Sequence, residues 1–246
     1  LVPSCPKFHT RHALKHQQEV IDKILLGNSC YIYWQGGVGS AKTMCVAAIC
    51  AAMAIMIPNS RGILFRKDYE LNHVTLWGYF LDSIEAAFEQ NILQGSFKRC
   101  LAVKKAGKHT ELHLPNGSYY KAGQTKNLSQ YMGPSYDVIA ISDAMENDNF
   151  GYIFHGEGTV GGLQSRLRGQ VSTNYKLPSG ETKDMRRFII ESNPPPNINE
   201  LHTIFGKKPC EGTFPNSNIQ YTHIQSHSIQ NDHNPPTYLE EITSQH

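Results

Sequence analysis

The sequence Gly-Gly-Val-Gly-Ser-Ala-Lys-Thr, at residues 36 to 43, carries the residue types that bind nucleotide phosphates. In a glycine-rich turn of this kind, backbone N–H groups grip phosphate oxygens, a lysine reaches the β- and γ-phosphates, and a hydroxyl serves Mg²⁺. The pattern therefore predicts a site for ATP and Mg²⁺, in which Lys42 meets the phosphates and Thr43 meets the metal. The residues assigned to phosphate binding are Gly36, Gly37, Val38, Gly39, Ser40, Ala41, Lys42 and Thr43.

Ala41 departs from the usual phosphate-loop pattern, which has glycine at this position. An alanine is a small change if the residue is right-handed helical, because glycine is obligatory only where φ is positive. An aromatic, β-branched run precedes the loop and a long apolar segment follows it. This is the strand-to-helix context that a phosphate loop requires.

An acidic cluster follows the β-branched run Val138 to Ile141. ATP hydrolysis needs a metal ligand and a residue that orients water, as well as a phosphate loop. In a parallel sheet, a carboxylate at the end of this strand would lie beside that loop. We therefore assign Asp143 to Mg²⁺ and catalysis, and Glu146 is a second catalytic candidate. The alternative for Glu146 is the polar start of a helix.

Three further side chains could act on phosphate. Asn193 follows the strand at 187 to 191, and its amide could bind both the γ-phosphate and water. The alternative is a turn built by Asn-Pro-Pro-Pro. Arg166 and Arg168 are candidates for a catalytic arginine finger or for a contact to DNA phosphates.

These side chains need a frame, and the hydrophobic pattern predicts one. Buried strands alternate with helices, so we expect an α/β fold with a largely parallel central sheet and its chemistry at the strands' carboxyl ends. A Pro-Asn-Gly-Ser turn at 115 to 118, between alternating segments, predicts a β-hairpin. The predicted helices are 12–26, 42–57, 71–90 and 236–243, and the other predicted strands are 29–34, 62–66, 138–141, 187–191 and 219–224.

Composition sets the wider limits. The 246-residue chain suits one large domain, and its net charge of +2 does not announce nucleic-acid binding. Its basic clusters could form a phosphate-tracking surface if the fold gathers them, with solvated loops as the alternative. Six scattered cysteines favour a reducing, intracellular setting. The longest apolar run, at 44 to 57, has 14 residues, fewer than the ~20 that a membrane helix needs.

Taken in order, these motifs resemble those of a known family along nearly the whole chain. The chain resembles the ATPase domain of the large terminase subunit, the DNA-packaging motor of tailed bacteriophages. The matching motifs are a glutamine-bearing helix at Gln17 and Gln18, the loop at 36 to 43, Arg66-Lys67, Asn116-Gly117-Ser118, Gly133, Ser165-Arg166-Leu167-Arg168, Asn193-Pro194 and the tail Gln230 to Leu239.

The resemblance implies a P-loop NTPase fold of the RecA or ASCE type, with a β-hairpin insertion, as a single domain over 1 to 246. It places Gln17 and Gln18, in the segment 1 to 28, on the adenine side, and it gives Asn193 the coupling of γ-phosphate state to movement. It implies ATP hydrolysis that drives double-stranded DNA into a procapsid, a homo-oligomeric ring (a pentamer when active), and a portal protein and a small terminase subunit as partners. The expected location is the cytoplasm of the infected bacterium, without a membrane, and the family's nuclease domain is expected to begin where this chain stops.

Two positions depart from the family pattern. Val38 stands where the family commonly has arginine. The family's Asp-Glu-Ala motif aligns with Ser142-Asp143-Ala144, so Ser142 takes the metal-ordering position and Asp143 the water-activating position. A shift of one residue would make Asp143 the metal residue instead. Two alternatives to a motor stay open: a nucleotide-binding assembly switch with weak or no turnover, and a helicase-like ATPase, for which a second RecA-like domain does not fit in the remaining length.

Overall fold

The computed structural model describes residues 15–105, 107–147, 150–157, 160–177, 179–194, 200–214 and 219–227. The tail motif at 230 to 239 and the predicted helix at 236 to 243 lie outside the described residues. Among the helices that are described, none combines the length and the apolar composition that crossing a bilayer requires.

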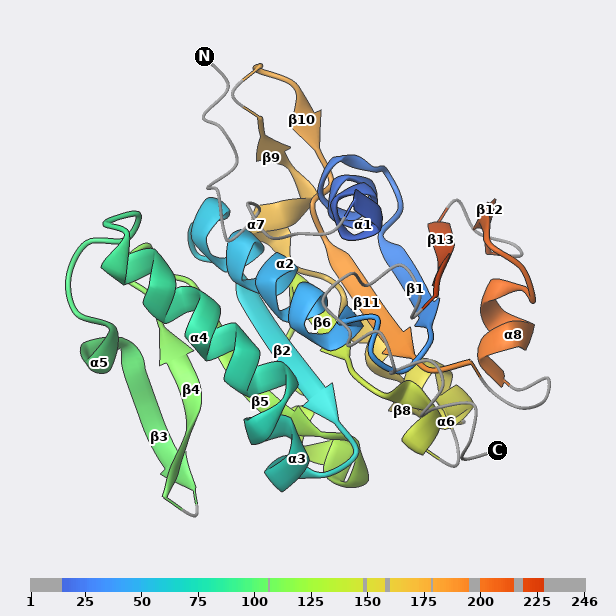
Figure 1. Cartoon of the computed structure of the whole chain (residues 1–246), viewed down its shortest axis with the longest axis horizontal. Coiled ribbons are helices and arrows are strands. Elements are labelled where there is room, and N and C mark those ends of the chain that lie inside the picture. Colours follow the sequence, from blue (N-terminus) through green and yellow to red (C-terminus); the bar gives the residue numbers. More distant parts are fainter. Residues whose placement is uncertain are drawn as a thin grey trace, which may run out of the picture.

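A nine-stranded sheet forms the centre of the chain, in the order β12-β13-β1-β11-β6-β2-β5-β4-β3 (Figure 1). The inner strands from β13 through β5 run parallel, and β12, β4 and β3 each run antiparallel to their neighbours. The α/β class, the largely parallel sheet and the hairpin are confirmed. The strands are β1 (Tyr31–Gly36), β2 (Arg61–Arg66), β3 (Leu101–Lys105), β4 (Lys108–His113), β5 (Tyr119–Gln124), β6 (Val138–Ile141), β11 (Arg187–Ser192), β12 (Cys210–Thr213) and β13 (Gln220–Ser226).

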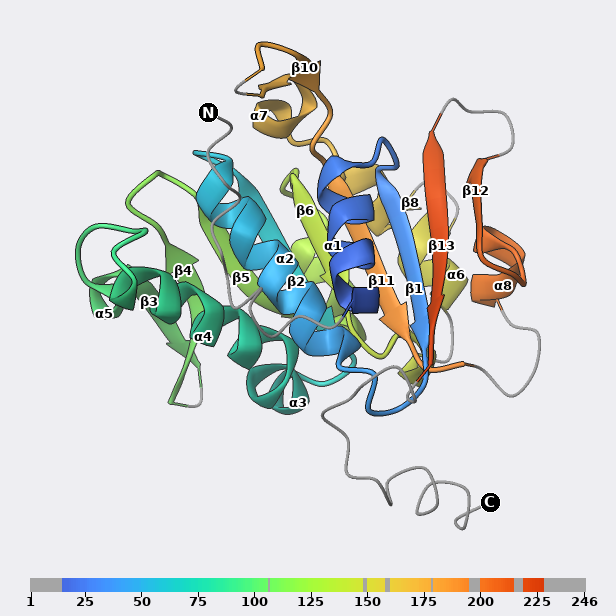
Figure 2. The ribbon, with the colours of Figure 1, turned by 45° about the horizontal axis from the view of Figure 1, so that its top comes forward.

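Helices cover the sheet, with α1, α2 and α4 together on one face (Figures 1 and 2). The α-helices are α1 (Lys15–Leu26), α2 (Lys42–Met56), α3 (Tyr69–Val74), α4 (Leu76–Glu89), α5 (Phe97–Cys100), α6 (Phe150–His155), α7 (Gln170–Thr173) and α8 (Glu200–Phe205). The 3₁₀ segments of the described residues are η2 (Thr125–Tyr131), η3 (Ala144–Glu146) and η4 (Leu163–Arg166). Two short antiparallel ribbons pair β7 (Gly156–Glu157) with β8 (Val160–Gly161), and β9 (Tyr175–Lys176) with β10 (Thr182–Lys183).

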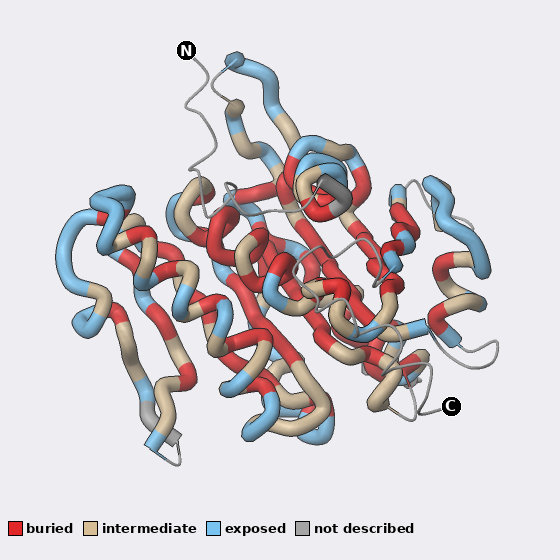
Figure 3. Tube along the Cα trace, viewed as in Figure 1, coloured by how far each residue is buried: buried red, intermediate tan, exposed pale blue. Residues whose placement is uncertain are grey.

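The central strands are buried on both faces, and their side chains divide between two cores. Trp34 and Ile189 point into the core under α1, α2 and α4. Tyr33 and Ile190, one residue away in each strand, point into the second core, which α6 and α8 close. Such strands read as continuous apolar runs because helices cover both sides of a parallel sheet. Figure 3 shows burial concentrated along these strands and exposure at the rim.

The single helix predicted at 71 to 90 is wrong, because the chain breaks at Thr75 into α3 and α4. Thr75 has φ −127° and ψ −107°, outside the helical region. The fully buried Asn72 explains the break, since its side-chain amide donates to the Leu64 and Gly123 carbonyls at 2.8 Å each. Asn72 thereby fastens α3 to the ends of β2 and β5, and α4 starts afresh.

The predicted turn between β4 and β5 closes the far end of α2. Gly117 has φ +83°, a conformation that glycine adopts without steric cost. The Asn116 amide donates to the carbonyls of Ala54 and Ile55 at 2.9 and 3.1 Å. The Ser118 hydroxyl donates to the Ile57 carbonyl at 2.9 Å. The turn therefore satisfies carbonyls that a helix end leaves without intrahelical partners.

Candidate functional site

The loop at 36 to 43 lies at the edge of the sheet where the parallel strands end. β1 ends at Gly36 and α2 begins at Lys42, so the strand–loop–helix context that the sequence predicts is present. β11 lies between β1 and β6, and β13 lies on the other side of β1. The carboxyl ends of β11 and β13 are therefore the loop's immediate neighbours, and the end of β6 is one strand further away.

Close packing against β13 explains why glycine begins the loop. A Cβ atom on Gly36 would collide with the Ser226 hydroxyl. The Trp34 indole holds that hydroxyl at 3.0 Å, and the Gly37 N–H donates to the Ser226 carbonyl at 3.3 Å. The loop is thus fixed to β13 where its backbone turns away from the sheet.

Ala41 is left-handed, with φ +56° and ψ +26°. An alanine would be a small change only in a right-handed helical conformation, so it is not a small change here. For a residue with a side chain, this conformation costs roughly 1–2 kcal/mol relative to the right-handed one. α2 also begins without a side-chain cap. The first N–H groups of an uncapped helix carry partial positive charge, which suits an anion.

The Lys42 ammonium is buried beneath the loop. It donates to the Gly36 carbonyl at 2.7 Å and to the Gly37 carbonyl at 3.1 Å. It also donates to the Asn193 side-chain oxygen at 3.2 Å, so two predicted site residues 151 positions apart meet. Burial lowers the pKa of Lys42, and the carboxylates of Glu191 and Asp143 oppose that shift.

Glu191 is the residue that the sequence prediction missed. Its Oε1 atom accepts a hydrogen bond from the Thr43 hydroxyl at 2.7 Å and another from the Ser142 hydroxyl. The Asp143 N–H lies 3.3 Å from the same oxygen. One carboxylate therefore joins the start of α2 to the end of β6. In the sequence, Glu191 is visible as an acid directly after the apolar run at 188 to 190. Its role could not be inferred without knowing that β11 lies next to β1.

The Glu191 side chain is fully buried, and its other oxygen, Oε2, has no hydrogen-bond partner among the described residues. Burial raises the pKa of Glu191, and the Asp143 charge raises it further. The Lys42 charge and the hydrogen bonds from Ser142 and Thr43 work in the opposite direction. A buried carboxylate oxygen without a partner is costly, and a bound cation would offset that cost.

Asp143 and Glu146 lie together just beyond β6, held by one arginine from β2. The Arg66 Nη2 atom is 2.5 Å from Asp143 Oδ2 and 3.1 Å from Glu146 Oε1. Burial raises the pKa of Asp143, although the Arg66 charge lowers it. Asp143 is itself left-handed, with φ +47°. The two predicted catalytic acids therefore share a cation.

The two predicted adenine-side glutamines differ in environment. Gln17 is buried, whereas Gln18 donates to Asp22 at 2.9 Å on the exposed side of α1. α1 runs antiparallel to β1, so its first turn points toward the phosphate-loop edge (Figure 2). Of the two, Gln17 is the one turned into the protein.

Arg166 and Arg168 lie at the opposite edge of the sheet, where the parallel strands begin. The N–H of Tyr136, just before β6, donates to the Arg166 carbonyl at 2.8 Å, and the Gly169 N–H returns a bond to Tyr136 at 2.9 Å. A cavity of about 580 Å³ opens beside this segment, and Arg168 lines it. The structure therefore does not bring these arginines to Lys42 of the same chain.

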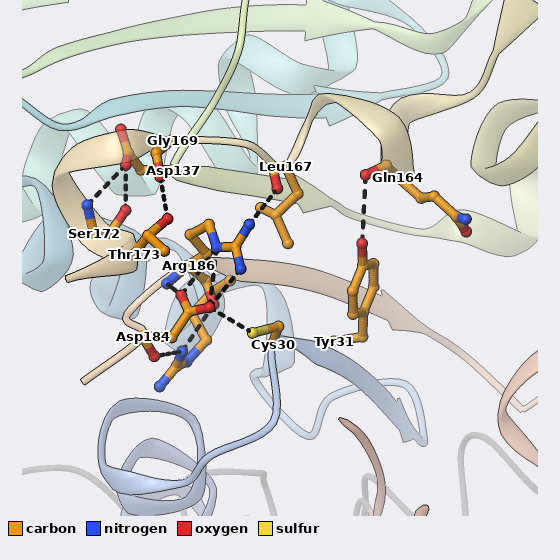
Figure 4. Close-up of polar contacts among 11 residues, drawn as sticks. Cys30, Tyr31, Asp137, Gln164, Leu167, Gly169, Ser172, Thr173, Asp184 and Arg186 are labelled. Atoms are coloured by element: carbon orange, nitrogen blue, oxygen red, sulfur yellow. Dashed lines mark hydrogen bonds and ion pairs between the residues drawn. The ribbon is translucent and has the colours of Figure 1, made fainter. Parts of the chain in front are cut away.

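A second arginine of that cavity is already neutralised. Arg186 Nη2 lies 2.5 Å from Asp184 Oδ2, and Arg186 Nη1 donates to the Leu167 carbonyl at 3.1 Å (Figure 4). Nearby, the buried Asp137 accepts bonds from the Ser172 hydroxyl and N–H. These contacts hold together the loops at the edge where the parallel strands begin. Arg168 is the other arginine that lines the cavity.

The described residues contain no group of three or more His, Cys, Asp or Glu side chains that could hold a metal ion. Mg²⁺ at nucleotide sites does not need one, because it takes one or two protein carboxylates together with phosphate oxygens and water. Thr43, Ser142 and the unpartnered oxygen of Glu191 form such an oxygen-rich set, so the residues present fit this ion.

Comparison with known proteins gives the fold a name. No protein-family model and no curated protein matches the chain. The large terminase ATPase domain of Thermus phage P74-26 matches with a TM-score of 0.53 and 16% identity, over 92% of this chain and 86% of that chain. A mutant of that domain matches at a TM-score of 0.54 and 15% identity, with the same coverage. A large terminase from a thermophilic bacteriophage matches at 0.57 and 10%, over 95% of this chain and 50% of its own. The chain has the fold of phage large-terminase ATPase domains.

Proposed function

We propose that this chain binds and hydrolyses ATP as the motor domain of a viral large terminase, which moves double-stranded DNA into a procapsid. The observation that carries the proposal is the convergence of Lys42, Thr43, Asn193 and a buried carboxylate at the start of α2. The likeness of the fold to large-terminase ATPase domains supports the same function.

The loop and the side chains around it each have a role in this proposal. Residues 36 to 43 would hold the phosphates, and Gln17 would contribute on the adenine side. Thr43, together with Ser142 and the carboxylates near it, would hold Mg²⁺. When bound, that ion would neutralise charge on the transferred phosphate. Asn193, which accepts a hydrogen bond from Lys42, would couple the state of the γ-phosphate to movement.

Hydrolysis needs a residue that orients the attacking water, and in this proposal that residue is Asp143 or Glu146. Both acids contact Arg66, which therefore fixes where each carboxylate lies. The Arg66 charge stabilises the ionised form of Asp143, which makes that carboxylate a weaker base. The position of Arg66 therefore bears directly on turnover.

Arg166 and Arg168 would act away from the nucleotide site of their own chain. At the amino edge of the sheet, they could serve a neighbouring subunit of a ring or the DNA backbone. The remaining partners proposed are a portal protein and a small terminase subunit, with the infected bacterium's cytoplasm as the setting.

A second candidate function is a nucleotide-binding switch with little or no turnover. It is favoured by the uncharged Ser142 and by the engagement of both acids with Arg66. The test is ATP turnover with Mg²⁺, measured alone, with double-stranded DNA, and with DNA and procapsids. DNA-stimulated turnover supports the motor, whereas tight ATP binding without turnover under all three conditions supports the switch. Lys42→Ala should abolish the activity, and the exposed Lys98→Ala should not.

A further inference from the structure

We infer that Glu191, near the end of β11, supplies the carboxylate of the Mg²⁺ site, in place of an acid at the end of β6. This inference rests on the proposed nucleotide-binding function and deepens it by assigning the metal ligand. It also explains why the position that should hold an acid, Ser142, can lack a charge.

Strand order gives Glu191 the shorter reach to the loop. Adjacent strands are about 4.8 Å apart, so a side chain on β11 is one spacing from β1 and a side chain on β6 is two. Within the sheet, Glu191 is directly beside Trp34, two residues before the last residue of β1. No other acid of the described residues lies on a strand adjacent to β1 and also bonds Thr43.

The alternation of side chains sends Glu191 to the correct face. Ile190 belongs to the core on the far side of the sheet, and Ile189 belongs to the core beneath α2. Glu191 therefore points to the α2 side, where helix α2 begins. The 2.7 Å bond from the Thr43 hydroxyl agrees with that direction. A threonine hydroxyl and a carboxylate in contact are the usual protein ligands of Mg²⁺ at a nucleotide site.

The contacts of Glu191 leave one oxygen for a ligand. Oε1 is occupied by Thr43 and Ser142, whereas the buried Oε2 has no partner among the described residues. Asp143, the other candidate, is already paired with Arg66 at 2.5 Å. An unpartnered buried oxygen is better explained by a cation than is an oxygen that an arginine holds.

The same geometry makes Ser142 and Glu191 a compensating pair. Their side chains meet between β6 and β11, where two carboxylates would repel each other and one would take up a proton. A serine avoids that conflict and donates a hydrogen bond to the acid. The acid on β11 thus takes the place of an acid at the end of β6, where Ser142 stands.

The test measures metal binding separately from hydrolysis. Binding of a non-hydrolysable ATP analogue is titrated by calorimetry with Mg²⁺ and with chelator, and Mn²⁺ binding to the complex is followed by electron paramagnetic resonance. Glu191→Gln should keep the analogue affinity found in chelator and weaken Mn²⁺ binding by at least about tenfold, the lower bound for losing even an indirect support of a metal ligand. The double variant Ser142→Asp with Glu191→Gln should recover Mn²⁺ binding.

Asp143→Asn is the matched control and should keep Mn²⁺ affinity within about threefold of wild type, well below the loss expected for a ligand. Loss of Mn²⁺ by Asp143→Asn with Glu191 intact overturns the inference, even if Glu191→Gln fails to fold. So does wild-type Mn²⁺ affinity in a folded Glu191→Gln variant. A wild-type chain that binds no analogue, with or without metal, overturns the proposed function and the inference with it.

Discussion

The guanidinium of Arg66 lies 2.5 Å from the Asp143 carboxylate and also contacts both oxygens of Glu146, at 3.1 and 3.3 Å. Arg66 closes β2, and the two acids follow β6, the neighbouring strand. Three charged groups therefore form one unit beside the phosphate loop. The Arg66 charge lowers the pKa of Asp143.

Arg66→Gln should shift the acidic limb of ATP turnover to higher pH. Burial raises the pKa of Asp143 and Arg66 lowers it, so removing the arginine leaves the raising effects of burial and Glu146 less opposed. The measurement is the pH profile of turnover at saturating ATP. Arg61→Gln, an exposed arginine at the other end of β2, is the control. Identical profiles for wild type and Arg66→Gln would rule out Asp143 as the titrating acid.

Ala41→Gly should raise the free energy of unfolding by about 0.5–1 kcal/mol. Removing the Cβ relieves a left-handed conformation that costs roughly 1–2 kcal/mol, and the greater freedom of glycine in the unfolded chain takes back part of that gain. Chemical denaturation measures the change. The control, Ala48→Gly inside α2, should lower stability by about 1 kcal/mol. A loss in both variants would mean that position 41 is not left-handed.

Asn116→Ala should lower the free energy of unfolding by about 1–3 kcal/mol. It removes the two hydrogen bonds that satisfy the Ala54 and Ile55 carbonyls at the end of α2. Thermal and denaturant unfolding measure the effect. The exposed Asn127→Ala should stay within about 0.5 kcal/mol of wild type. Equal stability of the two variants would show that the turn does not cap the helix.

Protonation of His223 should destabilise the fold below neutral pH. Its ring is buried, stacks on Tyr33 with centroids 4.7 Å apart, and contacts Gln35 at 3.2 Å. Burial lowers the pKa of His223, and the nearby His202 charge lowers it further. The unfolded chain protonates at about pH 6.5, so stability falls as pH drops below that value, by at most about 1.4 kcal/mol per pH unit.

The measurement is the free energy of unfolding between pH 8 and pH 5. His223→Gln should flatten the slope, because glutamine keeps a polar side chain without titrating. His155→Gln replaces an exposed histidine and should leave the slope as in wild type. An unchanged slope in His223→Gln would assign the effect to another group.

The parts of the fold that the sequence predicted are those with local signals. The loop at 36 to 43 has its own glycine pattern, and the four residues of β6 form an uninterrupted apolar run. The break at Thr75 was missed because Asn72 is fastened by carbonyls from two distant strands. No helical periodicity reports such contacts.

The same limit applies to the site, where residues in local motifs could be predicted and Glu191 could not. Lys42, Thr43 and Asn193 could be assigned from motifs, and the structure brings them together with Asp143 nearby. Glu191 could not, because its position beside the loop depends on β11 lying between β1 and β6. That order is decided by packing along the whole sheet and leaves no mark in the residues around the acid.

α2 is fastened at both ends, and this makes it a strut. Lys42 and Thr43 tie its first turn to the end of β11, while the turn at 116 to 118 ties its last turn to the hairpin. Its 15 residues span about 22 Å. A displacement of α2 along its axis would therefore reach both the phosphate loop and the turn between β4 and β5, which lie inside the edge strand β3. A spectroscopic label there would register, at a distance, what happens at the phosphate loop.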